Sequence, residues 1–263
     1  MNNKYRIIDT HAHIFPDKIS EKAVKNIGNY YSLHMSGKGT VDDLLENGKK
    51  IGVVKYVVHS SATRAGQVNS INDYVCQEVK KHENFIGFGT LHPDMKKPEV
   101  EVQRIIALGI KGIKLHPEFQ NFRIDDISAM FLYAAIEGKL PLLIHMGDEN
   151  SDFSSPQRLV NVLQHFPHLT VIAAHFGGYQ MWNDSYKYLI GKNIYMDTSS
   201  ALEFLEPSEA VNMIRSHGVQ RFLFGSDYPM WDHEQELARF LKLDLTEPEK
   251  EAILYSNAAR LLL

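Results

Sequence analysis

Histidine and aspartate side chains recur at one kind of position in this sequence, the C-terminal end of a short apolar run. The first run, residues 7–13, ends in His11-Ala12-His13. Because side chains alternate along a strand, His11 and His13 are expected to point to the same side. Two imidazoles on one side of a strand can bind one metal ion as neighbouring ligands. A motif this short also arises by chance, so the pair alone more often reflects two unrelated polar residues.

Seven more apolar runs follow along the chain, and each of them also leads to a histidine or an aspartate. These end residues are His59, His92, His116, His145, His175, Asp197 and Asp227. Amphipathic stretches separate the runs. Strands that alternate with helices predict a parallel sheet, and eight such units in 263 residues predict a closed (β/α)8, or TIM, barrel. An open doubly wound sheet is the alternative, but the first run lacks the Gly-rich phosphate turn usual in that fold.

The predicted elements can be given as residue ranges. Strands are expected over residues 7–13, 53–59, 85–92, 110–116, 141–145, 170–175, 194–197 and 221–227, and helices over 18–30, 40–51, 68–81, 98–108, 127–137, 155–166, 186–190 and 208–217. The helix at 18–30 belongs to an insertion after the first strand, which we interpret as a cover over the barrel mouth. Thr40 is expected to cap the next helix, with Asp43 at the capping-box position. Residues 246–263 are predicted to form a helical tail.

The predicted barrel would bring these histidines and aspartates close together. The C-terminal ends of all eight strands meet at one mouth of such a barrel, and active sites lie there. Neutral imidazole and carboxylate groups suit a divalent transition metal such as zinc. An open coordination position admits a water, whose pKa the metal lowers towards neutrality, and a nearby carboxylate or imidazole can then exchange the proton. The remaining histidines, to which we assign no chemistry, are His34, His82, His165, His168, His217 and His233.

Composition narrows the class of protein. Apolar residues make up 44% and charged residues 23% of the chain, which is typical of a globular protein with a sizeable core. The net charge of −4 gives no indication of nucleic-acid binding. A single cysteine, Cys76, excludes an internal disulfide and suits a reducing compartment. With no secretory or transmembrane run, we expect a cytoplasmic enzyme of one domain over residues 1–263, with a small-molecule substrate, no membrane partner and homo-oligomerisation as an option.

Five sequence motifs, taken together in this order, resemble those of a known family. They are Asp9-Thr10-His11-Ala12-His13, Gly112-Ile113-Lys114-Leu115-His116-Pro117, Ala174-His175-Phe176-Gly177-Gly178, Phe224-Gly225-Ser226-Asp227-Tyr228-Pro229 and the C-terminal Asn257-Ala258-Ala259-Arg260-Leu261-Leu262. The chain resembles the amidohydrolase superfamily, in the amidohydrolase-related branch that includes aminocarboxymuconate-semialdehyde decarboxylase. The resemblance extends over nearly the whole chain.

This resemblance implies a role for several residues. His11, His13, His145 and Asp227 match the ligands of a mononuclear metal site, with Zn²⁺ as the expected ion and Mn²⁺ as the alternative. His175 matches the residue that helps to activate the metal-bound water or polarises the substrate. Asp227 is expected to accept a proton as well as to bind the metal.

The fourth predicted strand leaves two readings open. Other members of the superfamily use a carboxylated lysine or a glutamate here to bridge two metals. Lys114 and His116 share a face, so Lys114 could form such a bridge or His116 could support a second metal. The alternative, to which we give more weight, is that Lys114 forms an ion pair inside the barrel and His116 orients a neighbour.

Residues in the predicted loops are candidates for substrate binding. Arg64 and Arg123 could clamp a substrate carboxylate, although loop arginines are more often solvated. Trp182 and Tyr228 could form apolar pocket walls, although packing is an equal alternative. Other residues near strand ends have two interpretations each. Asp9 is a buried carboxylate or a histidine partner, and Asp197 is a histidine partner or a helix cap. His59 and His92 are expected to support neighbouring ligands or to pack, and Trp231 is a pocket wall or a packing residue.

The residues support three hypotheses for function. The first is a metal-dependent hydrolase that cleaves a small amide, lactone or ester-like bond with metal-activated water. The second is a metal-dependent non-oxidative decarboxylase, a lyase, which would use the same residues on a carboxylated substrate. The third is a barrel that binds metal without catalysis.

Overall fold

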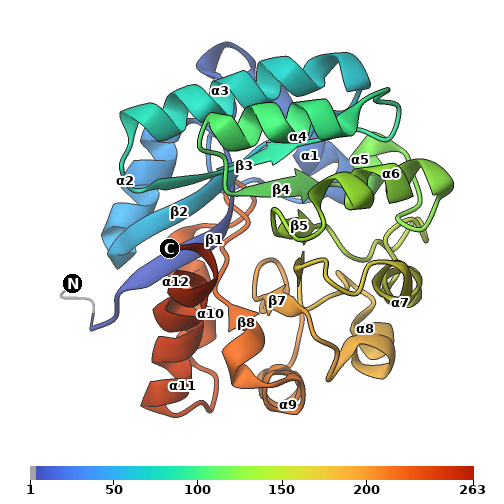
Figure 1. Ribbon diagram of the computed structural model, residues 1–263. Coiled ribbons are helices and arrows are strands. Elements are labelled where there is room, and N and C mark those ends of the chain that lie inside the picture. Colours follow the sequence, from blue (N-terminus) through green and yellow to red (C-terminus); the bar gives the residue numbers. More distant parts are fainter. Residues whose placement is uncertain (1–3) are drawn as a thin grey trace. The chain divides into compact units, whose positions relative to one another are not determined.

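The strands of the protein follow one another in space as they do in the sequence. A computed structural model describes residues 4–263. Its eight strands form one sheet in the order β1 to β8, with helices between successive strands (Figure 1). The pairs from β3 to β7 are parallel. An open doubly wound sheet would reverse its strand order at a switch point, so this uninterrupted order favours the predicted barrel topology.

The strands are β1 (Ile7–His13), β2 (Val53–His59), β3 (Phe85–Thr90), β4 (Gly112–Leu115), β5 (Leu142–Ile144), β6 (Val171–Ala173), β7 (Tyr195–Asp197) and β8 (Phe222–Leu223). The helices are α1 (Asp17–Tyr31), α2 (Val41–Ile51), α3 (Val68–Lys81), α4 (Pro98–Ala107), α5 (Pro117–Gln120), α6 (Ile127–Ile136), α7 (Pro156–His165), α8 (Trp182–Leu189), α9 (Pro207–His217), α10 (His233–Leu241), α11 (Glu247–Glu251) and α12 (Asn257–Leu262). Short turns η1 (Ala65–Gln67) and η2 (Val219–Arg221) and the π-helix η3 (Ala252–Ser256) complete the set.

The chain divides into two compact units. The first contains residues 1–58 and 198–263, and the second contains residues 59–197. The first unit thus holds β1, most of β2, and β8 with the last four helices, while the second holds β3 to β7. The predicted single domain over the whole chain stays a prediction.

In the first unit, the end of β8 and the loop after it run beside β1. The backbone N–H of Thr10 donates to Phe224, and that of His13 donates to Tyr228. The predicted helical tail is present: Ile253 and Leu254 of η3 are fully buried, and η3 and α12 lie against β1 and β8. This packing explains why an apolar C-terminal segment forms helix here.

The insertion after β1 forms a helix where one is predicted. Helix α1 buries only Ser20 and Gly28, so its other side chains are at least partly accessible. A Cβ atom at Gly28 would lie 2.9 Å from the carbonyl oxygen of Leu33, which explains the glycine. Whether this helix acts as a cover stays a prediction.

The start of α2 differs in one detail from expectation. The Thr40 hydroxyl accepts a hydrogen bond from the Asp43 backbone N–H, as predicted for a cap. The Asp43 carboxylate, however, accepts from the Tyr228 hydroxyl at 2.6 Å and from the Lys38 backbone at 2.8 Å. In the described structure it is drawn towards these donors, and the predicted capping box does not form.

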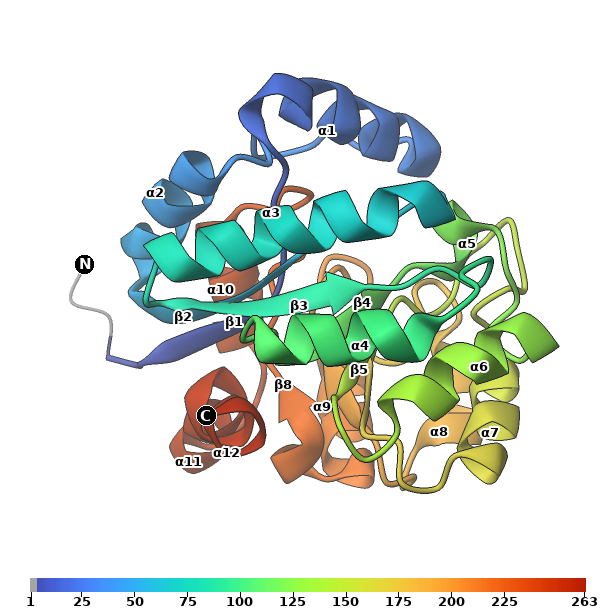
Figure 2. The ribbon, with the colours of Figure 1, turned by 45° about the horizontal axis from the view of Figure 1, so that its top comes forward.

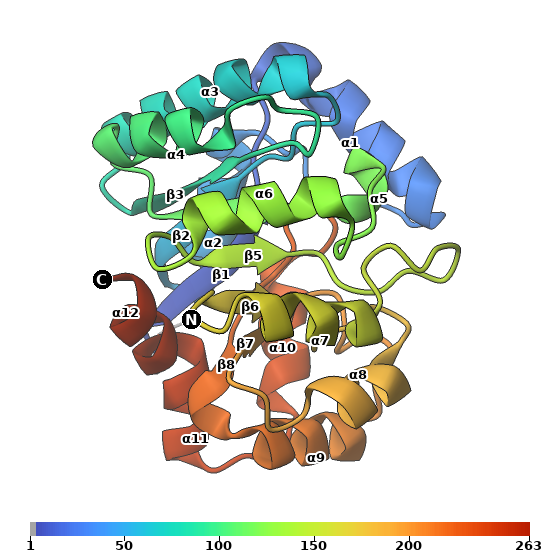
Figure 3. The same ribbon diagram turned by 45° about the vertical axis from the view of Figure 1, so that its right-hand side comes forward.

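In the second unit, helices cover the strands on their outer side. Figure 2 shows α3 and α4 along β3 and β4, and Figure 3 shows α6 and α7 on either side of β5. Strands β4, β5 and β6 are shorter than predicted. His116 already caps α5, and His175 has a left-handed backbone with φ of 61°. The site histidines of this unit therefore lie in loops just beyond the strands, not within them.

Three helices differ from the ranges that the sequence predicts, and the nine-residue helix α10 was not predicted. Helix α8 begins at Trp182, four residues before the predicted start. Helix α5, a single turn after His116, was not predicted because it is too short to show periodicity. Among the helices of residues 4–263, none combines the length and the apolar character needed to cross a membrane.

Candidate metal centre

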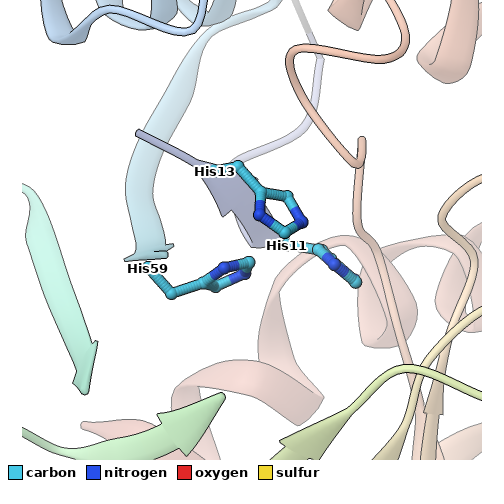
Figure 4. A group of neighbouring side chains, drawn as sticks. All are labelled: His11, His13 and His59. Carbon is cyan, nitrogen blue, oxygen red and sulfur yellow. The ribbon is translucent and has the colours of Figure 1, made fainter. Parts of the chain in front are cut away.

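The first unit brings three predicted ligands together. The rings of His11 and His13 extend from β1 to the same side, with centroids 5.3 Å apart, which confirms the alternation argument (Figure 4). Figure 4 also draws His59, the last residue of β2. One oxygen of Asp227, Oδ1, lies 3.3 Å from Nε2 of His11 and 3.3 Å from Nε2 of His13. All three side chains are at least largely buried.

These separations test whether the residues fit a metal ion. A charge-assisted hydrogen bond between imidazole and carboxylate would be about 2.7–2.9 Å long. Ligand atoms about 2.0–2.2 Å from a tetrahedral zinc ion lie about 3.3–3.5 Å apart. The distances from Asp227 to His11 and His13 match the second geometry, so this group fits a divalent cation.

Backbone hydrogen bonds place Asp227 beside β1. Its N–H donates to the carbonyl oxygen of His11 at 2.9 Å, and its φ of 56° is left-handed. Its second carboxylate oxygen, Oδ2, accepts a hydrogen bond from Ser200 at 2.6 Å. Asp227 is therefore held from both its backbone and its side chain.

Polar neighbours also hold β1. Ser199 lies 3.1 Å from Nδ1 of His11, so a proton on Nδ1 would leave Nε2 with its lone pair towards Asp227 and a cation. The Asp9 carboxylate accepts from the His11 backbone at 3.1 Å, from the Ser226 backbone at 3.0 Å and hydroxyl at 2.6 Å, and lies 3.0 Å from Nε2 of His233. Asp9 is thus a buried carboxylate that links β1 to the loop after β8.

Tyr228, a predicted pocket wall, lies in the interior of the first unit. It is 1% exposed and its hydroxyl contacts Thr40, Asp43 and the Gly39 backbone. Burial and the Asp43 carboxylate raise the pKa of Tyr228 above its ordinary value. Its contact with substrate stays a prediction.

The second unit brings His145 and His175 together. Nδ1 of His145 lies 2.9 Å from Nε2 of His175, while Nε2 of His145 lies 2.8 Å from the carbonyl oxygen of Gly147. Because a carbonyl only accepts, Nε2 of His145 carries a proton and Nδ1 of the neutral ring presents its lone pair. Two imidazole nitrogens about 2.9 Å apart can share a proton, or they can be neighbouring ligands of one ion at about 90°.

The backbone of His175 is fixed by neighbouring side chains. Its N–H donates to the Asp197 carboxylate at 2.9 Å, and its carbonyl accepts from Trp182 Nε1 at 3.1 Å. The Trp182 ring also packs edge-on against Tyr179, with centroids 6.3 Å apart. Asp197 and Trp182 thereby hold the left-handed turn at His175, and the role of Trp182 as a pocket wall stays a prediction.

His116 stacks between two rings. Its ring is parallel to those of Phe119, 3.8 Å away, and His145, 4.0 Å away, each with an interplanar angle of 10°. Its Nδ1 accepts a long hydrogen bond of 3.4 Å from the Phe119 backbone. Lys114, on the same predicted strand, is fully buried, and its position in β4 pairs with Thr90 and Leu143.

Glu118 joins His116 and His145, and sequence reasoning missed it. Its Oε2 lies 3.7 Å from Nδ1 of His116 and 3.8 Å from Nε2 of His145, so the three residues lie close enough to hold an ion. Nε2 of His145 could bind such an ion only after losing the proton that it donates to Gly147. Its other oxygen accepts from Ser154 at 2.6 Å and Ser151 at 3.2 Å. Burial raises the pKa of Glu118 to about 7 despite these hydrogen bonds.

The two loop arginines are exposed. Arg123 lies 3.4 Å from Asp152 and over the ring of Phe153, and Arg64 precedes η1. For each of them a role in substrate binding stays a prediction. His92 is buried, accepts a hydrogen bond from the Asp94 backbone at 3.2 Å, and has its pKa lowered by burial.

Several residues around the ligands were not foreseen. Ser199, Ser200 and Glu118 each contact a predicted site residue, and Gly147 supplies the carbonyl that orients His145. The two serines follow the strand-seven residue Asp197 closely, so their place after a barrel strand is the signal that could have found them.

Comparison with known proteins identifies the family. The sequence model of the amidohydrolase family matches residues 8–263. The chain belongs to the amidohydrolase family. The resemblance predicted from the motifs is thereby confirmed, and the group of His11, His13 and Asp227 in the first unit is a candidate divalent-metal site.

Solved structures support the fold of this member of the amidohydrolase family. An uncharacterised TIM-barrel protein from Bordetella bronchiseptica is 22% identical, with a TM-score of 0.79 over 97% of this chain and 98% of that one. A dihydroxybenzoic acid decarboxylase from a Polaromonas species, with bound manganese and 2-nitroresorcinol, is 16% identical, with a TM-score of 0.75 over 98% and 96%. A probable 2-pyrone-4,6-dicarboxylic acid hydrolase from Acinetobacter baumannii, with citric acid bound, is 18% identical, with a TM-score of 0.70 over 97% and 98%.

These likenesses show the fold and nothing finer. With eight strands in sequential order and helices between them, the chain has the (β/α)8, or TIM, barrel fold that the sequence predicts.

Proposed function

We propose that this amidohydrolase is a metal-dependent hydrolase of a small substrate with an amide, lactone or ester-like bond. The observation that carries the proposal is the approach of one Asp227 oxygen to Nε2 of both His11 and His13, at 3.3 Å each. That spacing suits ligands of one divalent ion better than it suits hydrogen bonds.

The proposed ligand set is the one that the sequence motifs imply: His11, His13, His145 and Asp227. Support for His145 comes from Gly147, whose carbonyl oxygen faces Nε2 at 2.8 Å and leaves Nδ1 as the coordinating atom. The ion is proposed to be Zn²⁺, with Mn²⁺ as the alternative. The barrel fold gives a reason to expect one shared site, because the C-terminal strand ends of such barrels form the active site.

The metal, when bound, supplies a Lewis acid that lowers the pKa of water and polarises a carbonyl group. The protein residues then have separate tasks. Asp227 accepts the proton that the attacking water loses and returns it to the leaving group. His175 donates a hydrogen bond to the carbonyl oxygen as negative charge develops there. The predicted arginines, Arg64 and Arg123, are proposed to attract a substrate carboxylate.

Decarboxylation is the second candidate function. The observation that favours it is the manganese-containing dihydroxybenzoic acid decarboxylase, which shares this fold over nearly its entire length. A second structure of that class, a 2,6-dihydroxybenzoate decarboxylase, was solved in complex with 2,6-dihydroxybenzoate. For this chain, the corresponding substrate would be a small aromatic carboxylate. The same ligands would hold the metal, and the proton held by Asp227 would replace the lost carboxyl group.

A substrate screen separates the two reactions. Metal-loaded protein is incubated with small lactones, amides and esters and with hydroxylated aromatic carboxylates, while released acid and released carbon dioxide are measured in parallel. Hydrolysis predicts acid without carbon dioxide. Release of carbon dioxide from a carboxylate, abolished in the Asp227→Asn variant, would replace the first proposal by the second.

A further inference from the structure

A buried hydroxyl group connects the proposed ligand Asp227 to a tryptophan. Ser200 Oγ lies 2.6 Å from Oδ2 of Asp227 and 2.8 Å from Nε1 of Trp231. Ser200 is 2% exposed, so solvent does not replace these partners easily. All three residues belong to the first unit.

The direction of these hydrogen bonds follows from chemistry. The indole Nε1–H of Trp231 can only donate, so Ser200 Oγ must accept from it. The Ser200 proton is then directed towards its other neighbours, of which the Asp227 carboxylate is far the better acceptor; the Met230 sulfur lies at 3.4 Å. Trp231 therefore fixes Ser200 as a donor to Asp227.

Trp231 is itself held in place. The guanidinium of Arg239 lies over its ring, 4.9 Å from the centroid, and Arg239 forms ion pairs with Glu203 and Glu236. Phe204 packs edge-on against the same ring at 6.1 Å. These contacts hold the indole ring in the orientation that directs its N–H at Ser200.

The backbone at Ser200 gives an independent observation. Its φ is 53°, in the left-handed region that glycine adopts at lower cost than serine. A residue with a side chain in this conformation points to a role for that side chain, because strained positions concentrate at functional sites.

We propose that Ser200 and Trp231 are positioning residues for the metal centre. Their hydrogen bonds hold Oδ2 of Asp227 and so turn Oδ1 towards His11 and His13. Ser200 acts through Asp227, and Trp231 acts through Ser200. The inference rests on the proposed metal site and adds to it the group that selects which carboxylate oxygen binds.

The test compares metal binding with stability. Ser200→Gly removes the hydroxyl but accepts the left-handed backbone. Trp231→Phe removes the indole N–H with its five-membered ring and keeps an aromatic side chain. Ser208→Ala at an exposed position of α9 is the control. Dissociation constants for Zn²⁺ and Mn²⁺ are measured by chelator competition, and thermal midpoints are measured on metal-free protein.

Ser200→Gly is expected to weaken metal binding by about 10–100-fold, the usual effect of losing an outer-shell partner. The thermal midpoint of the metal-free variant should change little, because the relief of the left-handed backbone by glycine offsets the loss of the two buried hydrogen bonds. Trp231→Phe should weaken binding by a smaller factor, and Ser208→Ala should have no effect. A purely structural role for Ser200 would move the midpoint and leave the dissociation constant alone.

Two results would overturn the inference, and they differ. If the wild-type protein binds metal and both Ser200→Gly and Trp231→Phe bind it equally well, the positioning role is wrong while the metal site stands. If the wild-type protein binds neither ion, the proposed function fails together with this inference. Should Ser200→Gly not fold, Trp231→Phe alone decides, because Trp231 is only partly buried and phenylalanine keeps an aromatic ring at this position.

Discussion

The two units of this protein hold their site residues in different ways. In the first unit, a carboxylate faces two imidazoles at 3.3 Å, longer than a charge-assisted hydrogen bond, and serines contact Nδ1 of His11 and Oδ2 of Asp227. In the second unit, imidazoles contact one another directly, at 2.9 Å between His145 and His175 and by stacking on His116. The first arrangement leaves space between ligand atoms for a cation and supplies its countercharge. In the second, the Gly147 carbonyl places the proton of the His145 ring on Nε2.

This contrast assigns different consequences to substitutions in the two units. Changes at the first group should remove both charge and coordination. Substitutions in the second unit should show which ring, His145 or His116, coordinates the metal and which only stacks on the other.

The largest effect is expected at Asp227 in the first unit. Asp227→Asn keeps the shape of the side chain and can still accept a hydrogen bond from Ser200, but it removes the negative charge and the proton acceptor. Turnover should fall by about 10²–10⁴-fold, the usual contribution of a general base. Turnover and the thermal midpoint of the metal-free variant are measured together. Retained activity in a folded variant would remove Asp227 from the chemistry.

The second unit is tested by a matched pair of histidines. His145→Ala should weaken metal binding by more than about 10-fold, because the proposed ligand atom is lost. His116→Ala should change metal affinity far less, because the ring is proposed only to stack on His145. Chelator competition measures both. Equal losses would instead favour a second ion held by His116 and Glu118.

Gly147 provides a test of how the second unit orients its ring. Its φ is 79°, and a Cβ atom there would lie 2.5 Å from backbone atoms of Tyr179. Gly147→Ala should therefore destabilise the protein by about 3 kcal/mol through strain and crowding, and shift the carbonyl away from His145. Urea unfolding measures the first effect and metal affinity the second. An unchanged midpoint would show that the loop adapts without cost.

Glu118 predicts a smaller, pH-dependent difference. Because its pKa is raised to about 7 in the folded protein from 4.5, the unfolded chain loses this proton first as pH rises. The stabilisation that the raised pKa of Glu118 gives to the folded protein is complete below about pH 4.5 and is lost as pH approaches about 7. Glu118→Gln should remove about 1–2 kcal/mol of this decline after allowance for relaxation of the buried site. Parallel stability curves for wild type and variant between these pH values would contradict the raised pKa.

The parts of the site that sequence could predict are those fixed by periodicity. His11 and His13 lie on one side of β1 because a strand alternates, and the order of apolar runs predicted the eight strands. The roles of His145, His175 and Asp227 came instead from the resemblance of the motifs to the family. His116, His145 and His175 were expected as strand ends, yet they lie beyond strands that are shorter than predicted. The turn at His175 depends on a left-handed backbone that no apolar pattern encodes.

The side-chain contacts that surround the proposed ligands could not be predicted, for a related reason. Ser200 contacts Asp227 across 27 positions of sequence, and His233 contacts Asp9 across 224. Such pairs depend on loop geometry, and serine and histidine are common enough in loops to give no signal of their own. Asp43 shows the same limit, since its carboxylate is drawn to Tyr228 instead of closing the local motif.

The central claim is that the His and Asp groups bind one catalytic metal ion. The most direct measurement is the metal content of protein purified without chelators, by elemental analysis, for wild type and for Asp227→Asn. About one zinc or manganese ion per chain in the wild type, and a clear loss in the variant, is the predicted result. A wild-type protein free of divalent metal that cannot be loaded with either ion would contradict the account.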